Sequence, residues 1–235
     1  MIVIAKKEFT YGIVMAVMFF VILAIMFSPL FSGKTAFEAA DDFFNAISKG
    51  STYYMPALAK QGEPWNGKLF EVSLKFADKE AAGRAGKLLA ASGAQVSGDG
   101  AQLKVAGDLG KISAAALADS DAMFRNKGKE VADRYGFPER EVLLGWWTAF
   151  KEMDKDLKRQ KKFDEAAWLV TLSKRGVEVG YNFYRIEAKK ASAAAGMLTL
   201  TLIFYVAYTM WWGYAVLFLF EGLGLQMKPG AKKEV

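Results

Sequence analysis

The chain has two long stretches without a charged residue, at residues 9–33 and at residues 191–220. A helix needs about 20 apolar residues to cross a lipid bilayer, and each stretch exceeds that length. The pattern predicts transmembrane helices at residues 9–33 and 191–222. The residues between them mix charged and apolar positions, which predicts an extramembrane domain attached to the membrane at both ends.

Small and aromatic residues within the apolar stretches indicate helix contacts. Gly12 and Ala16 in the first stretch, and Ser192 and Gly196 in the second, have the small-xxx-small spacing that lets helices approach closely. The aromatic residues of the second stretch have two interpretations: bulk packed against lipid or another helix, or a contact with a hydrophobic ligand or partner subunit. Neither stretch contains a charged side chain, which a proton or ion pathway would normally need.

Lysines flank the two apolar stretches and predict the orientation of the chain. They are Lys6 and Lys7 before the first stretch, and Lys228, Lys232 and Lys233 after the second. The positive-inside rule makes residues 1–8 a cytoplasmic N-terminus and residues 223–235 a cytoplasmic basic tail, with the domain outside the cytoplasm. The first stretch is longer than the core of a secretory signal, about 7–15 residues, so we interpret it as a signal anchor in a bacterial inner membrane.

Residues 34–67 are expected to form a juxtamembrane helix and loop. Thr35 and Glu38 have the spacing of a capping box, and the helix that they begin should end before Gly50. The adjacent carboxylates Asp41 and Asp42 would point in different directions around that helix, as on a solvated face. Residues 51–65 are expected to form a loop.

Residues 68–136 are predicted to form a small α/β domain. Residues 68–76 alternate between apolar and polar side chains, the pattern of a half-buried strand. Asp78 can cap a helix over residues 79–92 that ends at Gly93. Two shorter strands, residues 95–97 and 102–106, follow around a glycine turn and complete a split β-α-β sheet. One further helix is expected over residues 112–135.

Residues 137–190 are predicted to form a long helical hairpin. Apolar residues recur every three or four positions along the first arm and mark its buried stripe: Leu143, Trp146 or Trp147, Phe150, Met153 and Leu157. The second arm has a stripe of its own: Ala167, Val170, Leu172, Val177, Tyr181 and Tyr184. No proline separates this arm from the second apolar stretch, so the pattern predicts one continuous helix from Asp164 to about Glu221. Gly176 and Gly180 either weaken that helix or allow a close helix crossing.

The composition narrows the chemistry that the chain can carry out. It has no His and no Cys, which removes the commonest general base, thiolate chemistry, disulfides and the preferred zinc ligands. We therefore predict no metal and no cofactor. The net charge of +6 is spread among interleaved charges of both signs, without the basic stripe typical of nucleic-acid binding, so no nucleic-acid partner is expected.

One acidic pattern has both a chemical and a structural interpretation. Asp119, Asp121 and Glu130 match three positions of a calcium loop. Met123 and Phe124 then occupy positions that require an oxygen ligand and a glycine. We therefore interpret the pattern as an acidic helix surface.

We predict a non-catalytic accessory or scaffold subunit, anchored in the membrane within a larger bacterial inner-membrane complex. Its partners would be the lipid bilayer and other membrane-protein subunits or further copies of the same chain. Aromatic residues are enriched in protein interfaces. The candidate interface residues are Trp146, Trp147, Tyr181, Tyr184, Tyr208, Trp211 and Trp212. For the two tryptophans of the domain, the alternative is a place in the domain core.

Three other functions remain open. Two terminal spans, a small α/β base and a long helical arm resemble the architecture of bacterial polysaccharide co-polymerases, which implies self-assembly into a ring in the inner membrane. Residues 197–225 contain no proline, so the proline-rich motif of that family is missing here. A ligand-sensing extracytoplasmic domain has the same topology. An enzyme using carboxylates alone would rely on Glu139 and Glu141, although acidic residues at a helix start also interact favourably with the helix dipole.

Overall fold

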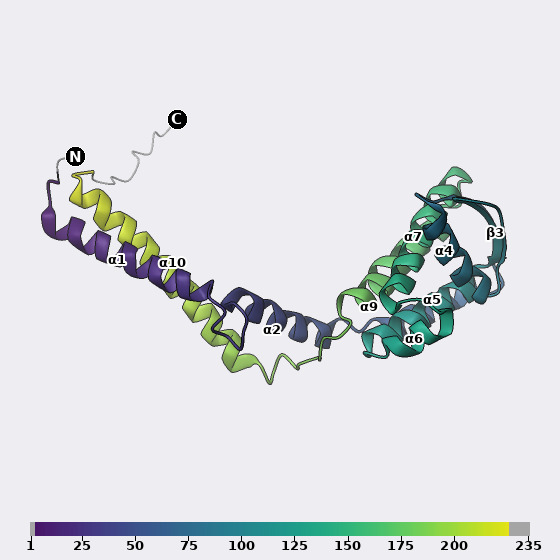
Figure 1. Cartoon of the computed structure of the whole chain (residues 1–235), viewed down its shortest axis with the longest axis horizontal. Helices are drawn as coiled ribbons and strands as arrows, with labels where there is room; N and C mark the ends of the chain where they lie inside the picture. The colour runs from purple at the N-terminus through teal and green to yellow at the C-terminus, as the bar shows by residue number, and fades with distance from the viewer. Residues whose placement is uncertain (1–2, 226–235) are drawn as a thin grey trace, which may run out of the picture. The chain divides into compact units, whose positions relative to one another are not determined.

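The computed structural model describes residues 3–225 and is mostly helical, with one small sheet (Figure 1). The chain divides into two compact units. One comprises the residues up to Ile47 and from Lys189 onward, and the other comprises residues 48–188. The predicted cytoplasmic tail falls outside the described residues from residue 226 onward.

The first unit contains two long apolar helices, α1 (Lys6–Met26) and α10 (Ala195–Gly222). They lie side by side and antiparallel (Figure 1), and the backbone N–H of Ile4 donates to the carbonyl oxygen of Gly222 at 2.9 Å. Both helices are long and apolar enough to cross a membrane, with mean hydropathies of 2.5 and 1.6. Only 6% of the most apolar window of each is buried, unlike a helix in the core of a soluble domain.

The first apolar helix is shorter than predicted. It ends at Met26 rather than at residue 33. Pro29 disfavours the helical conformation of the residue before it. Ser32 and Gly33 then adopt left-handed backbone angles, with φ of 56° and 80°, and turn the chain toward α2.

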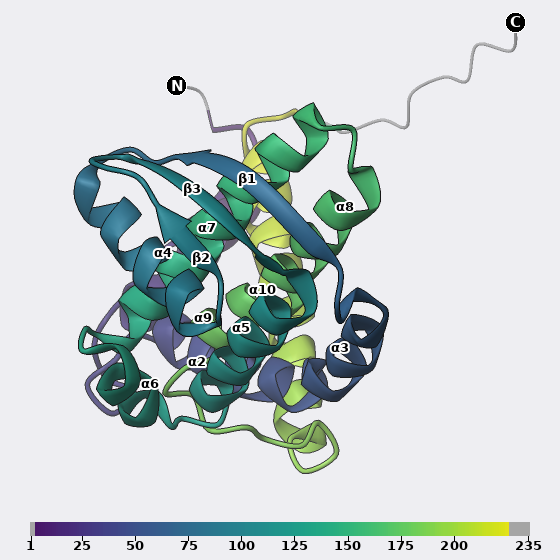
Figure 2. The ribbon, with the colours of Figure 1, turned by 90° about the vertical axis from the view of Figure 1, so that its right-hand side faces the viewer.

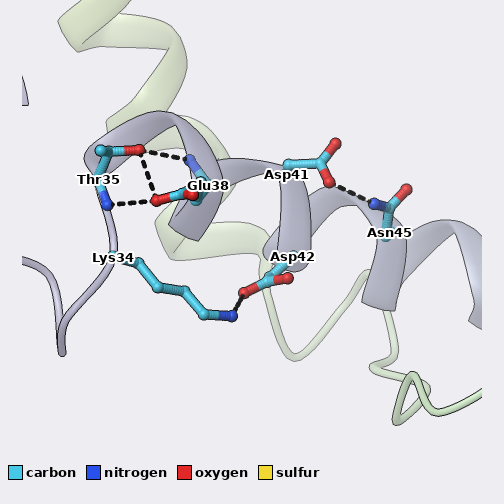
Figure 3. Close-up of polar contacts among 6 residues, drawn as sticks. All are labelled: Lys34, Thr35, Glu38, Asp41, Asp42 and Asn45. Atoms are coloured by element: carbon cyan, nitrogen blue, oxygen red, sulfur yellow. Dashed lines mark hydrogen bonds and ion pairs between the residues drawn. The ribbon is translucent and has the colours of Figure 1, made fainter. Parts of the chain in front are cut away.

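Helix α2 (Ala36–Ser51) begins at the predicted capping box (Figure 3). The N–H of Thr35 donates to the Glu38 carboxylate at 2.8 Å, and the N–H of Glu38 donates to the Thr35 hydroxyl at 3.2 Å. Asp41 accepts a hydrogen bond from Asn45, whereas Asp42 pairs with Lys34, so the two carboxylates point apart as expected. The helix continues through Gly50, which was expected to stop it.

The second unit contains a three-stranded sheet formed by β1 (Leu69–Lys75), β2 (Gln95–Ser97) and β3 (Gln102–Asp108). Strand β3 lies between the other two and is antiparallel to both (Figure 2). Strands β1 and β2 are therefore parallel, and α4 (Lys79–Ala91) connects them. This is the predicted split β-α-β sheet.

Local signals place the sheet and its helix as predicted. The side chains of β1 alternate between exposed and buried, and its buried face packs against α7 (Glu139–Arg159). The Asp78 carboxylate accepts the N–H of Ala81 at 2.8 Å and caps α4. Gly93 follows the helix with a φ of 87°, a left-handed angle that glycine adopts without steric cost.

Two segments differ from the sequence prediction. The expected loop at residues 51–65 contains α3 (Met55–Gly62) and a 3₁₀ turn, η1 (Glu63–Trp65). Pro56 does not prevent this helix, because proline is tolerated in a first helical turn. Met55 and Leu58, one turn apart, are both buried and anchor the helix on the domain. The expected helix over residues 112–135 is instead two helices, α5 (Leu109–Phe124) and α6 (Gly128–Tyr135). Asn126, with a φ of 62°, separates them.

The predicted hairpin is formed by α7 and a second arm made of α8 (Phe163–Leu172), the π-helical turn η2 (Ser173–Val177) and α9 (Glu178–Asn182). The predicted stripe of α7 is buried, with Trp146 rather than Trp147 at its centre. In the second arm Leu172, Val177 and Tyr184 are buried as predicted, whereas Ala167 is exposed and its neighbour Ala166 is buried in its place. Gly180 does allow a close crossing, since a Cβ there would lie 2.7 Å from the carbonyl oxygen of Ser120.

The prediction of one continuous helix from Asp164 to Glu221 is wrong. The second arm ends at Asn182, and α10 begins only at Ala195. Arg185 adopts a left-handed φ of 66° within the interruption. Side chains distant in sequence bind the backbone of this segment and hold it out of the helix.

Leu157 tests the assignment of the buried stripe. Its side chain is fully buried, so Leu157→Ala should lower the free energy of unfolding by about 2–5 kcal/mol through lost contacts and a cavity. Lys158→Ala, at the exposed neighbouring position, should change it by no more than about 0.5 kcal/mol. Urea unfolding followed by tryptophan fluorescence measures both, and equal losses would contradict the assignment.

Candidate functional site

The seven aromatic residues predicted as an interface lie in three different settings. Trp146 and Tyr184 are buried in the domain, at 0% and 8% exposure. Trp147 and Tyr181 are half-buried and line one surface groove. Tyr208, Trp211 and Trp212 belong to α10. Trp146 and Tyr184 are therefore core residues in this structure and present almost no surface to a partner.

Trp146 is held by a buried carboxylate, that of Asp119. Its indole N–H donates to Asp119 at 2.8 Å, Tyr135 donates its hydroxyl at 2.7 Å, and Arg134 donates at 2.5 Å. Asp119 is fully buried, so its interpretation as part of an acidic helix surface is wrong. Burial raises the pKa of Asp119, and the donors from Tyr135, Trp146 and Arg134 oppose that rise by stabilising the charged form.

The other acidic candidates are held in ion pairs. Glu139 pairs with Arg185 at 3.4 Å, and Glu141 lies 3.6 Å from Arg84. The backbone N–H of Glu139 donates to the carboxylate of the same residue, and this hydrogen bond lowers the pKa of Glu139 more than the nearby arginine charges do. Among residues 3–225, no group of three acidic side chains is arranged to hold a metal ion.

A groove of about 240 Å³ separates α7 from the end of the second arm. Its walls include Leu144 and Trp147 from α7, and Val177 and Tyr181 from the second arm. The Trp147 indole N–H donates to the Glu178 carboxylate at 3.0 Å, so the polar atom of this ring is paired across the groove. Leu144 is 44% exposed and so presents an apolar side chain to solvent beside the groove.

Two cations flank this groove. The Arg140 guanidinium lies 5.3 Å from the centre of the Tyr181 ring, and the Lys151 ammonium lies 4.9 Å from the Trp147 ring. Within the described part of the chain, neither cation is within ion-pair distance of a carboxylate. The groove therefore combines an apolar floor with one carboxylate, Glu178, which is already bound by Trp147, and with two cations at its margins.

The aromatic residues of α10 make contacts with α1. The Tyr208 hydroxyl donates to the carbonyl oxygen of Phe19 at 2.9 Å, and the Trp211 indole N–H donates to that of Met15 at 3.1 Å. The Tyr208 and Phe19 rings stack with centroids 4.2 Å apart. These contacts support the helix-packing interpretation for Tyr208 and Trp211. Trp212 contacts Phe19 as well but remains 37% exposed.

Small residues allow α1 and α10 to approach closely, but only one of the two predicted pairs is involved. A Cβ added to Gly12 would lie 2.7 Å from the backbone nitrogen of Leu219, so Gly12 is a close contact as predicted. Gly196 has no atom within 4 Å of its added Cβ, so its predicted role is wrong. Its place is taken by Gly222, where a Cβ would lie 2.5 Å from the Cβ of Phe9. The closest contacts are thus near the start of α1 and the end of α10.

A buried lysine that the sequence analysis did not single out holds together the two ends of the domain. The Lys49 ammonium donates to the carbonyl oxygens of Phe183 at 3.0 Å and Ile186 at 2.5 Å, and to Asn126 at 3.1 Å. Asn126 also accepts the backbone N–H of Arg185 at 2.8 Å. Burial lowers the pKa of Lys49. An isolated lysine at the end of a polar helix carries no sequence signal of such a role.

Comparison of the chain with protein-family models, with curated proteins and with solved structures gave no match.

The buried carboxylate of Asp119 predicts an unusual pH dependence. Its folded pKa lies above the ordinary value of 3.8, so the folded chain binds a proton there more readily than the unfolded chain. Between these two pKa values, the contribution of Asp119 to stability falls as pH rises. The free energy of unfolding of wild type, minus that of Asp119→Asn, should therefore become more positive as pH is lowered from neutral toward 4. Urea titrations at several pH values measure it, and a constant difference would contradict the raised pKa.

The glycine contact between the apolar helices predicts a position-specific effect. Gly12→Val should destabilise the pair by about 1–3 kcal/mol because the new side chain would overlap the backbone of α10. Gly213→Val, with open space around it, is the matched control. The chain has no native cysteine, so Tyr11→Cys and Phe218→Cys, whose parent rings lie 6.3 Å apart, allow the contact to be measured by cross-linking. An equal cross-linking yield in Gly12→Val and Gly213→Val would contradict the close approach of α10 to Gly12.

Proposed function

We propose that this chain is a membrane-anchored, non-catalytic accessory or scaffold subunit of a larger bacterial inner-membrane complex. The observation that carries the proposal is the paired helices α1 and α10. They contact each other along one side, yet most of their large apolar side chains remain exposed, including Val17, Phe20 and Ile203 at 55–60%. Soluble proteins rarely expose apolar patches of such length, so lipid or partner helices must cover this surface.

The orientation follows from the lysines that flank the helices. Lys6 and Lys7 stand at the start of α1, and the antiparallel pairing places that end beside the end of α10. Under the positive-inside rule this end faces the cytoplasm, and α1 acts as a signal anchor. The domain of residues 48–188 then lies in the periplasm.

The groove between α7 and α9 is the surface that we assign to a partner subunit. Its apolar floor fits an apolar side chain, and its flanking cations Arg140 and Lys151 fit carboxylates on the same segment. Protein interfaces commonly combine an apolar centre with a polar rim. We therefore propose an acidic, amphipathic segment of another membrane subunit as the occupant.

Exposed Leu144 tests the groove without disturbing the core. Leu144→Asp should remove the partner from the complex, since an apolar contact worth about 1.5–3 kcal/mol is replaced by a carboxylate that repels an acidic segment. Phe163→Asp, at a position 61% exposed and outside the groove, is the matched control. Mild-detergent extraction, native gel separation and mass spectrometry of the band measure the association.

Each outcome of that experiment has a defined meaning. Co-migration with other subunits in wild type and Phe163→Asp, but not in Leu144→Asp, supports the proposal. A band containing this chain alone at a high multiple of its mass would favour the self-assembling ring instead. A monomer or dimer in wild type would contradict both, and full aqueous solubility without detergent would contradict the membrane anchor.

A further inference from the structure

A second site on the domain shares no lining residue with the groove. A cavity of about 390 Å³ opens between α3, η1 and α5, with Trp168 of α8 against it. An engineered apolar cavity of about 150 Å³ is large enough to hold benzene. This cavity therefore has room for a substituted aromatic ring, and its volume falls at the lower end of known ligand pockets, about 300–1,000 Å³.

The inner wall of the cavity is apolar and rigid. Met55, Leu58, Leu117 and Trp168 line it and are between 0% and 8% exposed. Gly62 also lines it, and a Cβ there would lie 3.4 Å from the Trp168 ring, so the absence of a side chain keeps the edge of the indole accessible. A flat aromatic ring fits such a wall better than a flexible or strongly hydrated molecule.

Ser113 supplies a buried polar group at this wall. Its hydroxyl accepts the indole N–H of Trp168 at 2.8 Å, and the residue is only 3% exposed. The other buried serine of the same helix, Ser120, donates its proton to the carbonyl of Ala116, whereas the Ser113 proton has no acceptor within residues 3–225. Buried donors are normally paired. The Ser113 hydroxyl thus offers one hydrogen bond to an acceptor placed in the cavity.

The rim of the cavity is acidic. Asp121 lines it but is already paired, with Arg125 at 2.9 Å and with the Tyr53 hydroxyl at 2.8 Å. Glu63 also lines the rim, and no cation of the described chain is within ion-pair distance of it. A ligand with a positive charge near the rim would pair with Glu63, and an anionic ligand would be repelled.

We propose that this cavity binds an aromatic amine that carries a hydrogen-bond acceptor at the end opposite its ammonium group. The ring lies against Trp168, the acceptor takes the proton of Ser113, and the ammonium group pairs with Glu63. No residue of α1, α10 or the groove lines this site, so it adds a ligand-binding capacity to the proposed scaffold.

Three probes of one size separate these contributions. Tyramine has the ring, the acceptor and the ammonium; phenethylamine lacks the acceptor; 4-hydroxyphenylacetate replaces the ammonium by a carboxylate. We expect tyramine to bind with a Kd below about 1 mM, phenethylamine to bind about 3- to 10-fold more weakly, and 4-hydroxyphenylacetate at least about 10-fold more weakly. Isothermal titration of the full chain in lipid nanodiscs, with empty nanodiscs as the blank, measures all three.

Two leucine substitutions on α3 provide matched controls. Ala59 lines the cavity and Ala57 does not, and both are exposed. Ala59→Leu should weaken tyramine binding by occupying part of the cavity, whereas Ala57→Leu should leave it unchanged, with equal melting temperatures for the two variants. Glu63→Gln should weaken tyramine about 2- to 5-fold but leave 4-hydroxyphenylacetate no weaker.

The proposal would be overturned by any of three results. These are no saturable binding of tyramine to wild type, equal effects of Ala59→Leu and Ala57→Leu, or binding of 4-hydroxyphenylacetate as tight as that of tyramine. None of them bears on the partner band of the native gel, so the two proposals fail separately.

Discussion

The ammonium group of Lys49 is the contact on which the arrangement of the domain depends. It lies near the start of the domain and binds two carbonyl oxygens near its end, with Asn126 holding the same segment from a third position. Burying a lysine is unfavourable unless its donors are satisfied, and here three acceptors and the ring of Phe124 at 5.0 Å surround it. The chain consequently enters and leaves the domain at one place.

The same rule, that a buried polar group must find a partner, accounts for the other long-range contacts. Asp119 is buried only because Trp146, Tyr135 and Arg134 all donate to it. Between the apolar helices, Tyr208 and Trp211 direct their polar atoms to carbonyl oxygens of α1, so that their rings fill the contact without leaving a donor in an apolar setting. In each unit, a few polar side chains therefore fix a register that apolar contacts alone would leave open.

Most elements that are specified by residues close together in the sequence were predicted correctly, whereas contacts between distant residues left no such signal. The cap at Asp78, the capping box at Thr35 and the alternation along β1 each depend on residues a few positions apart, and all were found. The break at Asn126 is local as well: Asn126 ends α5 in a left-handed conformation, and the N–H of Lys127 donates to the carbonyl oxygen of Ala122 at 2.8 Å, a cap that the prediction of one helix overlooked. The interruption after Asn182 instead involves Lys49, whose ammonium binds the carbonyl oxygens of Phe183 and Ile186 more than 130 residues away. Periodicity also does not distinguish Trp146 from Trp147 as the buried residue. Trp146 is buried because its indole N–H binds the carboxylate of Asp119 on α5, a contact that the pattern of α7 does not contain. The α3–α5 cavity was missed altogether because its lining comes from four separate segments.

The π-helical turn η2 determines which residues of the second arm face α7 and line the groove. In η2 the N–H of Glu178 bonds to the carbonyl of Ser173, five residues back, so the turn accommodates one residue more than an α-helix would. Each residue of an α-helix rotates the chain by about 100°, since 3.6 residues complete a turn. Without the extra residue, Glu178 and Tyr181 would be displaced around the helix by about that angle, away from Trp147 on α7. The π-helical turn thus brings the Trp147–Glu178 hydrogen bond and the two aromatic walls of the groove into one place, and a hairpin of two regular helices would bury or scatter the same residues.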